Sequence, residues 1–502
     1  MKILNTTGIS ATDLGVASKQ LWSELEVAIR YLSTTDQKLV ELAFTQMVVA
    51  HGEDRRKSGE FYIIHPVAAC LILTYLQLDA DTLCACLLHD VPEDTAVTLK
   101  DLSKDFSAEI VFLVEGVTKL SSIKYKGEDR YAENLRRMFI AMSQDLRVVF
   151  IKLADRLHNL RTLKHVKPEK RYRIALESLD IYAPIAERLG INFFKGEIED
   201  AAFQFVYPEE YKALLLKTDI EIERRNKILE KIHKQTSKIL DASEVPYLKL
   251  SGRSKRYYSI FKKLSEKGKT IEDLHDLVAL RVITATEENC YAILSVLQQH
   301  FKVVEGRFKD YIARPKSNGY QSLHLSVIDE RSGLPFEFQI RTQKMHEYAE
   351  YGVAAHWAYK NQSLSQADKM ALIKSESFQW LNELIELGEE KWTEEEYLEH
   401  VKLDIFNDRI FVLTPKNDPI DLPIGGTALD FAYRIHQEIG ETAKMAKVNG
   451  EIAKLSDTLN NGDVVEIITG KGQKPKKEWL EWVHTGMAKK HIRATIRKEN
   501  KG

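Results

Sequence analysis

The chain has 502 residues, of which 44% are hydrophobic, and its formal net charge at pH 7 is −2. This length is enough for about three domains of ordinary size, and the near-neutral charge excludes recruitment of nucleic acid by the field of the whole molecule. Anion binding must therefore depend on local clusters of Lys and Arg.

Targeting and redox signals are weak in this chain. The N-terminal segment MKILNTTGISATDLGV lacks the charged and apolar regions of a secretory signal. The longest largely apolar stretch, residues 66–78, is too short to cross a bilayer. The cysteines show no CxxC spacing, which favours buried free thiols over a disulfide framework, and they are Cys70, Cys84, Cys86 and Cys290. We therefore expect a cytoplasmic protein with no membrane partner.

Three short motifs combine imidazole and carboxylate groups. His65 lies in an HP pair, His89 and Asp90 lie in HDVPED, and Asp155 lies in ADRLHN. The segment DTLCACLLHD is apolar on nearly all sides and predicts a buried helix of a helical domain, with His89 and Asp90 at its end. Mixed nitrogen and oxygen donors suit a borderline cation such as manganese, iron or zinc. The motifs therefore predict a metal centre.

A second polar surface follows on the helix that carries Asp155. Asn159 and Thr162 follow Asp155 at spacings of four and three, so on a helix these three side chains share one face. The intervening leucines lie towards another face and predict packing there. One face of this helix is thus expected to line the centre.

The pattern changes after residue 200. Residues 211–242 predict a long amphipathic helix that connects two domains. Beyond it, the runs LVALRVIT, SLHLSVI and FEFQIR predict strands separated by Gly, Pro and Asn. A mixed α/β domain is therefore expected here.

Cationic and acidic side chains gather in this second domain. In FEFQIR, alternation places Glu337, Gln339 and Arg341 on one face, and Asp276 opens the run DLVALRVI. Carboxylates on neighbouring strands can hold Mg2+ that bridges nucleotide phosphates. This domain also contains two runs of basic residues. Each run alone could be a solvated charged loop, whereas polyphosphate is the simplest partner that would explain both runs. The basic runs contain Arg253, Lys255, Arg256, Arg307, Lys309, Arg314 and Lys316.

On these motifs, residues 20–200 resemble the HD hydrolase domain of the long RelA/SpoT homologue family. The resemblance implies that manganese is bound by His65, His89, Asp90 and Asp155. It also implies that Glu93 and Asp94 activate the attacking water. Substrate phosphate would meet Arg56 and Lys57, and guanosine or ribose would meet Asn159 and Thr162. Pro92 stands where relatives usually carry an aliphatic residue and removes an N–H donor before Glu93.

Residues 205–390 resemble the alarmone synthetase domain, a relative of nucleotidyltransferases. The resemblance implies that Asp276 and Glu337 serve Mg2+ and that Glu337 activates the attacking ribose hydroxyl. The expected contacts to ATP are Arg253, Lys255, Lys309, Gln339 and Arg341. The expected contacts to GDP or GTP are Tyr320, which stacks on guanine, with His324 and Lys316. The tetrapeptide Arg307, Phe308, Lys309, Asp310 has the basic form that resembles bifunctional members.

The C-terminal part resembles a TGS domain. In this family such β-grasp modules contact the 3′ end of deacylated tRNA on the ribosome, and His436 matches the position expected to help. A solvent-facing helix residue is the alternative for His436. The tail from Lys471 is rich in Lys and Arg and contains Trp479 and Trp482. This tail fits either RNA backbone contact or an amphipathic helix that docks on the synthetase domain.

The whole chain is therefore expected to be a multidomain α+β protein. We predict an all-α HD hydrolase domain over 1–200, a nucleotidyltransferase-like α/β synthetase domain over 201–395, a β-grasp TGS domain over 400–470 and a basic tail that starts a further helical region over 471–502. The predicted function is Mn2+-dependent hydrolysis of ppGpp or pppGpp to GDP or GTP and pyrophosphate, together with Mg2+-dependent pyrophosphoryl transfer from ATP to GDP or GTP. We also expect nucleotide in the synthetase domain to lower hydrolysis through the connecting helix. The alternatives are a hydrolase-dominant member with a weak synthetase and an RNA- or ribosome-binding regulator with relic sites.

Overall fold

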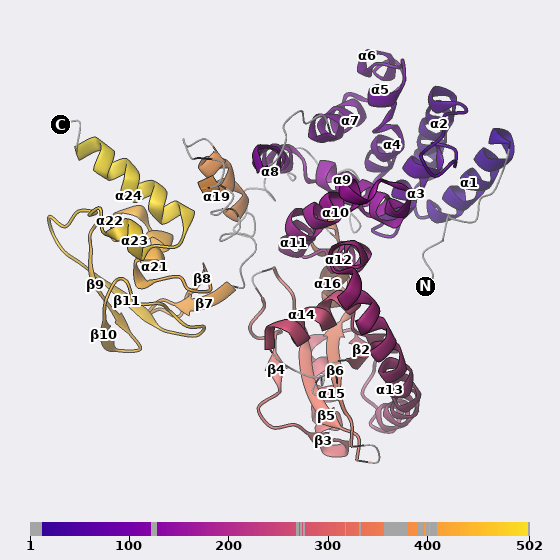
Figure 1. The fold of residues 1–502 in the computed structure, drawn as a ribbon. Coiled ribbons are helices and arrows are strands. Elements are labelled where there is room, and N and C mark those ends of the chain that lie inside the picture. Colours follow the sequence, from indigo (N-terminus) through magenta and orange to yellow (C-terminus); the bar gives the residue numbers. More distant parts are fainter. Residues whose placement is uncertain are drawn as a thin grey trace. The chain divides into compact units, whose positions relative to one another are not determined.

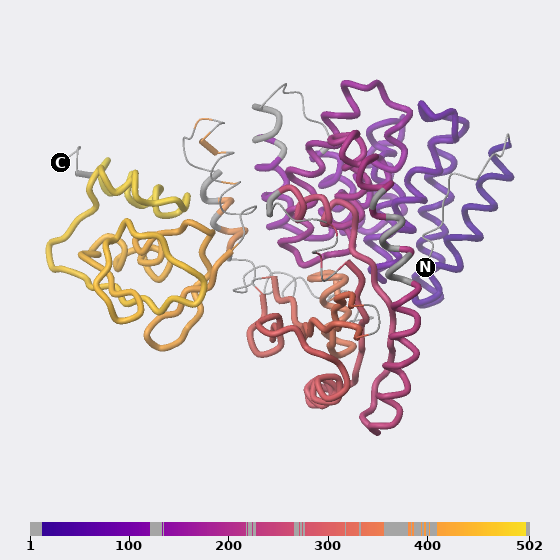
Figure 2. The backbone as a smooth tube through the Cα atoms, turned by 60° about the horizontal axis from the view of Figure 1, so that its bottom comes forward, coloured from indigo at the N-terminus to yellow at the C-terminus, as the bar shows by residue number. Residues whose placement is uncertain are grey.

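The protein is described by a computed structural model. The structure describes residues 13–121, 128–267, 271, 274, 277–316, 318–330, 333–355, 379–388, 393, 396, 397, 401 and 409–499. The chain divides into two compact units. In Figures 1 and 2 the colours follow the residue number from indigo at the N-terminus to yellow at the C-terminus. The first unit is Met1–Thr118 with Arg147–Ser365, and the second unit is Lys119–Leu146 with Gln366–Gly502. Within the described residues, no helix combines the length and the apolar character that crossing a membrane requires.

The N-terminal part of the first unit is helical. Asp13, Ser33 and Asp79 each cap a helix by accepting a hydrogen bond from a backbone N–H of its first turn. The predicted helix before His89 is confirmed, since nearly every residue of α4 is buried. The elements are α1 Leu14–Ala28, α2 Thr34–His51, α3 Ile64–Thr74, α4 Ala80–Leu88, α5 Val91–Asp94, α6 Leu99–Leu102, α7 Ala108–Ser121, α9 Leu146–Arg161, η2 Leu163–His165, α10 Pro168–Glu177, the π-helical η3 Ser178–Tyr182, α11 Ala183–Arg188 and α12 Asn192–Val206.

The C-terminal part of the first unit is a mixed sheet with helices. Among the described residues the strands lie in the order β1-β2-β6-β5-β3, with β4 paired to β5. Strands β2 and β6 are parallel and the other pairs are antiparallel. Helices α13 and α15 pack on this sheet (Figure 1). The elements are α13 Pro208–Ala242, β1 Lys249–Ser254, α14 Tyr257–Lys267, β2 Val278–Thr284, α15 Glu287–His300, β3 Lys302–Val303, β4 Lys309–Asp310, β5 Leu323–Ile328, β6 Pro335–Thr342, α16 Gln343–Tyr351 and η4 Gly352–Ala354.

Helix α12 joins the two parts of the first unit. It packs against α10 and α11 of the helical part and also against α13, α14 and α16. Glu197 of α12 accepts from Arg161 Nη2 at 2.8 Å and, through its other oxygen, from Arg256 Nη1 at 2.8 Å. Asp200 accepts from the backbone N–H of Tyr258 at 3.0 Å and thus caps the start of α14. One helix therefore contacts the end of α9 and the basic loop that precedes α14.

The main chains of the two parts also touch directly. The Val353 N–H donates to the Leu189 carbonyl at 3.0 Å. Gly190 and Gly352 both have positive φ, 74° and 55°, and a Cβ on Gly352 would overlap the backbone of residues 189–191. Glycine is required at Gly352 both by its conformation and by this close approach.

The second unit combines helices with two small sheets. Strands β10-β9-β11 form one sheet and β7-β8 form the other, and an isolated parallel bridge joins Leu413 to Val464. Helix α24 packs on α21 and α22 (Figures 1 and 2). The elements are α8 Glu128–Gln144, α19 Gln379–Gly388, β7 Arg409–Leu413, β8 Pro419–Pro423, α21 Ala428–Ile435, α22 Gln437–Glu441, β9 Ala443–Val448, β10 Glu451–Ala453, β11 Val465–Thr469, α23 Trp479–Trp482 and α24 Gly486–Glu499. The expected α+β architecture is thus confirmed.

Candidate functional site

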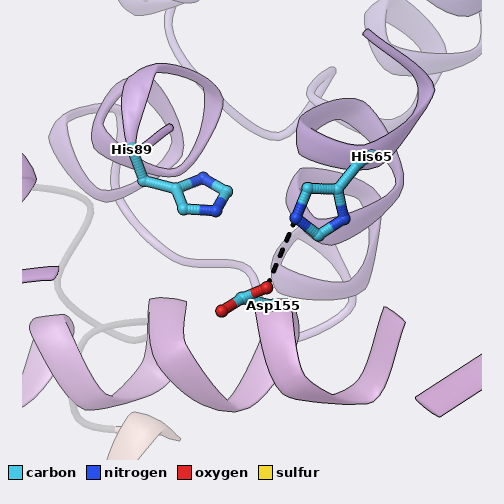
Figure 3. Close-up of side chains that lie close together, drawn as sticks. All are labelled: His65, His89 and Asp155. Atoms are coloured by element: carbon cyan, nitrogen blue, oxygen red, sulfur yellow. Dashed lines mark ion pairs between the residues drawn. The ribbon is translucent and has the colours of Figure 1, made fainter. Parts of the chain in front are cut away.

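Donor side chains from four helices converge in the first unit. His65 lies in the first turn of α3, His89 follows α4, Asp90 precedes α5 and Asp155 lies within α9. His65 Nε2 lies 3.3 Å from Asp155 Oδ1 and 3.4 Å from Asp90 Oδ2, and His89 Nε2 lies 3.2 Å from Asp90 Oδ1. Ligand atoms of His65, His89 and Asp155 all lie within 4.8 Å of one another (Figure 3). The four residues predicted as metal ligands therefore lie together.

The hydrogen bonding of His89 shows that this cluster fits a divalent cation. The ring is 1% exposed, and its Nδ1 lies 2.7 Å from the carbonyl oxygen of Cys86. A carbonyl oxygen only accepts, so Nδ1 carries the proton and Nε2 presents a lone pair. Within the described part of the chain, this buried Nε2 has no hydrogen-bond partner, and it faces the Asp90 carboxylate, which is also an acceptor. A cation held by these residues would satisfy both acceptors.

Lys152 orients and charges the Asp155 carboxylate. Its Nζ donates to Asp155 Oδ2 at 2.6 Å in a buried pair, so Oδ1 faces His65. Burial raises the pKa of Asp155, but the Lys152 ammonium and then His65 hold that pKa well below its usual value. Asp155 is therefore ionised, as a metal ligand must be. The sequence analysis missed Lys152, although its spacing of three residues from Asp155 on a helix was a usable signal.

Two further carboxylates lie beside the centre on α5. Partial burial and then the Asp90 carboxylate raise the pKa of Glu93 to about 7, so this carboxyl exchanges protons near neutrality. The hydroxyl of Tyr62 lies 2.9 Å from Asp90 Oδ2 and 2.5 Å from Asp94 Oδ2. Pro92 lies in the first turn of α5, where a backbone N–H has no helical partner to lose. Proline therefore leaves the start of this helix intact.

The predicted substrate contacts of the helical domain lie next to Asp155. Arg56 Nη2 donates to Asn159 Oδ1 at 2.6 Å, Arg56 Nη1 lies 3.5 Å from Thr162 Oγ1, and Asn159 Nδ2 donates to Asp155. Lys57 is exposed on the loop that carries Arg56. His158, which the sequence analysis left without a role, lies buried among these residues. The roles of all these side chains towards substrate stay predictions.

A polar network lies on one face of the sheet in the first unit. The predicted alternation of β6 places Glu337 and Gln339 on this face, where Gln339 Nε2 donates to Glu337 Oε1 at 2.8 Å. His324 of β5 lies beside them, with Nδ1 at 3.2 Å from Glu337 Oε1 and Nε2 at 2.9 Å from the Tyr320 hydroxyl. Arg253 Nη1 donates to Gln339 Oε1 at 3.3 Å. Residues predicted to bind two different nucleotides therefore meet in one network.

Three cationic side chains, of which Arg341 is buried, extend this network. Arg341 is 1% exposed, and its Nη2 lies 3.2 Å from Glu350 Oε1. Arg281 of β2 also pairs with Glu350, at 3.1 Å, and burial and then Arg341 lower the pKa of Arg281 to about 10. Lys316 lies over the rings of Tyr311 and Tyr320 at 5.0 and 5.3 Å. The sequence analysis missed Arg281 and Glu350, although an Arg within the apolar run LVALRVIT was a visible signal.

The remaining predicted residues of this domain differ in their placement. Lys309 of β4 pairs with His324 of β5 across the sheet, so its backbone lies at the network. The Lys255 N–H donates to the Leu277 carbonyl at 2.9 Å, just before β2 begins. Asp276, predicted to hold Mg2+, lies outside the described residues. The structure thus describes one of the two predicted magnesium carboxylates, Glu337.

The predicted RNA contact lies in the second unit. His436 is exposed between α21 and α22, and its Nδ1 accepts from the Glu438 N–H at 3.2 Å. The basic tail forms α23 and α24, and its Trp479 belongs to the core of this unit. Asp430 of α21 accepts from the backbone N–H of Thr485 at 2.9 Å and from its hydroxyl at 2.7 Å. The tail is therefore an integral part of the core that contains β7 to β11.

The fold and the sites define a class of multidomain protein in which an HD domain, a mixed α/β domain and a TGS domain follow one another. Three family models match the chain: "HD domain" over residues 42–192, "Region found in RelA / SpoT proteins" over 252–364 and "TGS domain" over 410–469. These matches coincide with the helical part, the mixed sheet and the small sheets.

Curated relatives are similar over most of the chain. The GTP pyrophosphokinase of Myxococcus xanthus is 43% identical over 94% of this chain and 62% of its own length. The guanosine-3′,5′-bis(diphosphate) 3′-pyrophosphohydrolase of Aquifex aeolicus is 43% identical over 90% and 63%. The bifunctional (p)ppGpp synthase/hydrolase SpoT of Escherichia coli K12 is 42% identical over 93% and 66%. The chain belongs to the RelA/SpoT family, and it spans about 62–66% of the length of these relatives.

Proposed function

We propose that the chain is a bifunctional alarmone enzyme of the stringent response. It hydrolyses ppGpp or pppGpp to GDP or GTP and pyrophosphate, and it transfers pyrophosphate from ATP to the 3′ hydroxyl of GDP or GTP. The observation that carries this proposal is the convergence of His65, His89, Asp90 and Asp155 in one domain, separate from the polar network around Glu337 in the next. The names of the relatives include both activities.

In the hydrolase reaction, the 3′ oxygen–phosphorus bond of the substrate breaks and water supplies the new oxygen on phosphorus. Manganese held by His65, His89, Asp90 and Asp155 would lower the pKa of the attacking water and stabilise charge on the phosphoryl oxygens. Glu93, whose pKa is raised to about 7 by burial and then Asp90, takes the proton of the water. Asp94 assists from the same helix. Arg56 and Lys57 bind phosphate, and Asn159 and Thr162 bind the nucleoside.

In the synthetase reaction, the 3′ oxygen of GDP or GTP attacks the β-phosphorus of ATP, and AMP leaves. Glu337 takes the proton of the 3′ hydroxyl. Glu337 and Asp276 would hold Mg2+, which would supply positive charge to neutralise the phosphates. Tyr320 stacks on guanine, with His324 and Lys316 holding that nucleotide. ATP is bound by Arg253, Lys255, Lys309, Gln339 and Arg341.

The division of labour is tested by two substitutions. Asp90→Ala removes a metal ligand, so we expect at least about a 100-fold loss of labelled ppGpp hydrolysis with synthesis retained. Glu337→Ala removes the base, so we expect at least about a 100-fold loss of ppGpp formation from labelled ATP and GDP with hydrolysis retained. Thin-layer separation of the labelled products measures both rates in the full chain.

Metal removal provides the control for these measurements. We expect EDTA to stop hydrolysis and Mn2+ to restore it better than Mg2+, because mixed imidazole and carboxylate donors suit manganese. Loss of both activities from either substitution, in a variant that remains folded, contradicts separate sites. Hydrolysis without detectable synthesis in the unsubstituted chain identifies the hydrolase-dominant alternative.

We further propose that the protein is cytoplasmic and that its TGS domain contacts deacylated tRNA on the ribosome. Support comes from the exposed position of His436 and from the similarity of residues 410–469 to TGS domains. Fluorescence anisotropy with labelled deacylated tRNA and ribosomes tests this proposal. We expect His436→Ala to weaken binding, and unchanged binding rejects the role of His436.

A further inference from the structure

A buried histidine to which we have assigned no role lies against the proposed metal centre. His158 is 5% exposed and lies three residues after Asp155 on α9. Its Nδ1 lies 2.7 Å from Nδ1 of His65 and 3.3 Å from Nη1 of Arg56. A single ring nitrogen therefore contacts a metal-site histidine and a guanidinium.

The guanidinium decides where the proton between the two rings lies. Arginine has donors and no acceptor, so Nδ1 of His158 must present its lone pair to Arg56. The same lone pair faces Nδ1 of His65, and the proton of that short contact must therefore belong to His65. With its Nδ1 protonated, the neutral ring of His65 leaves Nε2 with a lone pair. That Nε2 is the atom that faces Asp155 and Asp90.

We propose that His158 is a positioning residue that holds His65 in the tautomer able to bind a cation, with Arg56 setting the direction of the hydrogen bond. Without an acceptor at this position, His65 can carry its proton on Nε2 instead. That proton would then be donated to Asp155 or Asp90, and it would occupy the space between the ligands. Partners of this kind fix the orientation and tautomer of metal-bound imidazoles in proteins. This inference rests on the proposed metal centre.

The test measures Mn2+ affinity of the full chain, using the electron paramagnetic resonance signal of the free ion. His158→Leu removes the acceptor at similar volume, and we expect affinity to fall about 10- to 100-fold. His158→Asn keeps an acceptor oxygen near the place of Nδ1, and we expect a loss below about threefold. His158→Gln moves its amide one bond further and should resemble the Leu variant. Exposed His165 gives the matched control, His165→Leu, which should bind as the unsubstituted chain does.

Each outcome bears on the proposal. Thermal unfolding in EDTA identifies any variant that does not fold. If His158→Leu does not fold, the comparison of His158→Asn with His158→Gln still tests the proposal. Recovery of hydrolysis by the Leu variant at saturating Mn2+ supports a role through metal binding. Unchanged affinity in folded Leu and Gln variants, or equal losses in Asn and Gln variants, overturns the proposal while leaving the metal centre in place. If the unsubstituted chain binds no Mn2+, the metal centre fails and this inference fails with it.

Discussion

Tyr62 connects a predicted metal ligand, Asp90, to Asp94, a carboxylate predicted to activate the attacking water. Its ring stacks on the buried ring of His51, with centroids 4.5 Å apart, and its hydroxyl lies between Asp90 and Asp94. Burial and then the Asp90 carboxylate raise the pKa of Tyr62, so the phenol keeps its proton throughout the physiological range. That proton reduces the repulsion between two carboxylates that face the same hydroxyl.

Removing this hydroxyl should weaken the centre. We expect Tyr62→Phe to raise the Mn2+ concentration for half-maximal hydrolysis about 10-fold, because Asp90 loses a partner that orients it. Titration of the hydrolysis rate with Mn2+ measures this change. Tyr172→Phe removes a hydroxyl from a half-exposed ring and serves as the control. An unchanged metal requirement would show that Tyr62 does not orient Asp90.

The predicted ligands stand out in the sequence, whereas most of the residues that contact them do not. His65, His89, Asp90 and Asp155 have the donor chemistry of a metal site, and they stand in short motifs. Lys152 could have been found from its spacing to Asp155 on one helix, whereas His158 and Tyr62 contact residues of other elements, so their side-chain chemistry alone does not distinguish them from ordinary structural residues. The same holds for Glu350, whose two arginine partners lie on different strands.

Helix α12 contains a carboxyl group in an unfavourable position. Glu199 is 6% exposed, and burial, opposed by Lys195, raises its pKa from 4.5 to about 7. The folded state therefore binds this proton more tightly than the unfolded state does. The contribution of protonated Glu199 to the free energy of unfolding is therefore complete below about pH 4.5, and it is lost as the pH rises to about 7.

Neutralising this carboxyl should stabilise the protein at alkaline pH. We expect Glu199→Gln to raise the free energy of unfolding by about 3 kcal/mol at pH 8 and by less than about 1 kcal/mol at pH 5. Urea unfolding of the unsubstituted chain and of Glu199→Gln at both pH values measures the difference in the free energy of unfolding. Glu41→Gln, at an exposed position of α2, should change stability by less than about 0.5 kcal/mol at either pH. Equal effects of Glu199→Gln at pH 5 and pH 8 contradict the raised pKa.

Long helices with a clear hydrophobic period were predictable from the sequence. Very short strands were not, and neither was the unit to which a given helix belongs. The predicted helix over 211–242 corresponds to α13, Pro208–Ala242, because an apolar stripe among many charges has a clear helical period. Strands β3 and β4 have two residues each and carry no period that a sequence can show. Helix α8 belongs to the second unit although its neighbours in sequence belong to the first, and local patterning does not encode such a choice.

At the scale of the whole molecule, the helical part and the mixed-sheet part of the first unit share a charged contact. Glu197 binds Arg161, at the end of the helix that carries Asp155, and Arg256, next to Lys255 in the basic loop. Burial raises the pKa of Glu197, but Arg256 and Arg161 lower it below its usual value, so the carboxylate stays ionised. If nucleotide binding displaces the basic loop, as the proposed function implies, this contact is a route to the helix that carries Asp155.

Coupling between the two activities should depend on Glu197. We expect a nonhydrolysable ATP analogue with GDP to lower hydrolysis about fivefold or more in the unsubstituted chain and less than about twofold in Glu197→Gln. Glu223→Gln breaks an exposed ion pair with Lys227 and serves as the matched control. Hydrolysis rates with and without the nucleotides measure the coupling. Equal inhibition in Glu197→Gln excludes this route, and no inhibition in the unsubstituted chain excludes the coupling itself.

The meeting of Gly190 with Gly352 limits how the two halves of the first unit can move. Shear motions between domains proceed by small sliding of packed elements in which a layer of side chains separates the backbones. Here the two backbones touch with no such layer between them. A side chain at position 352 would therefore push the two backbones apart, and sliding one half along the other at this crossing would bring main-chain atoms into overlap.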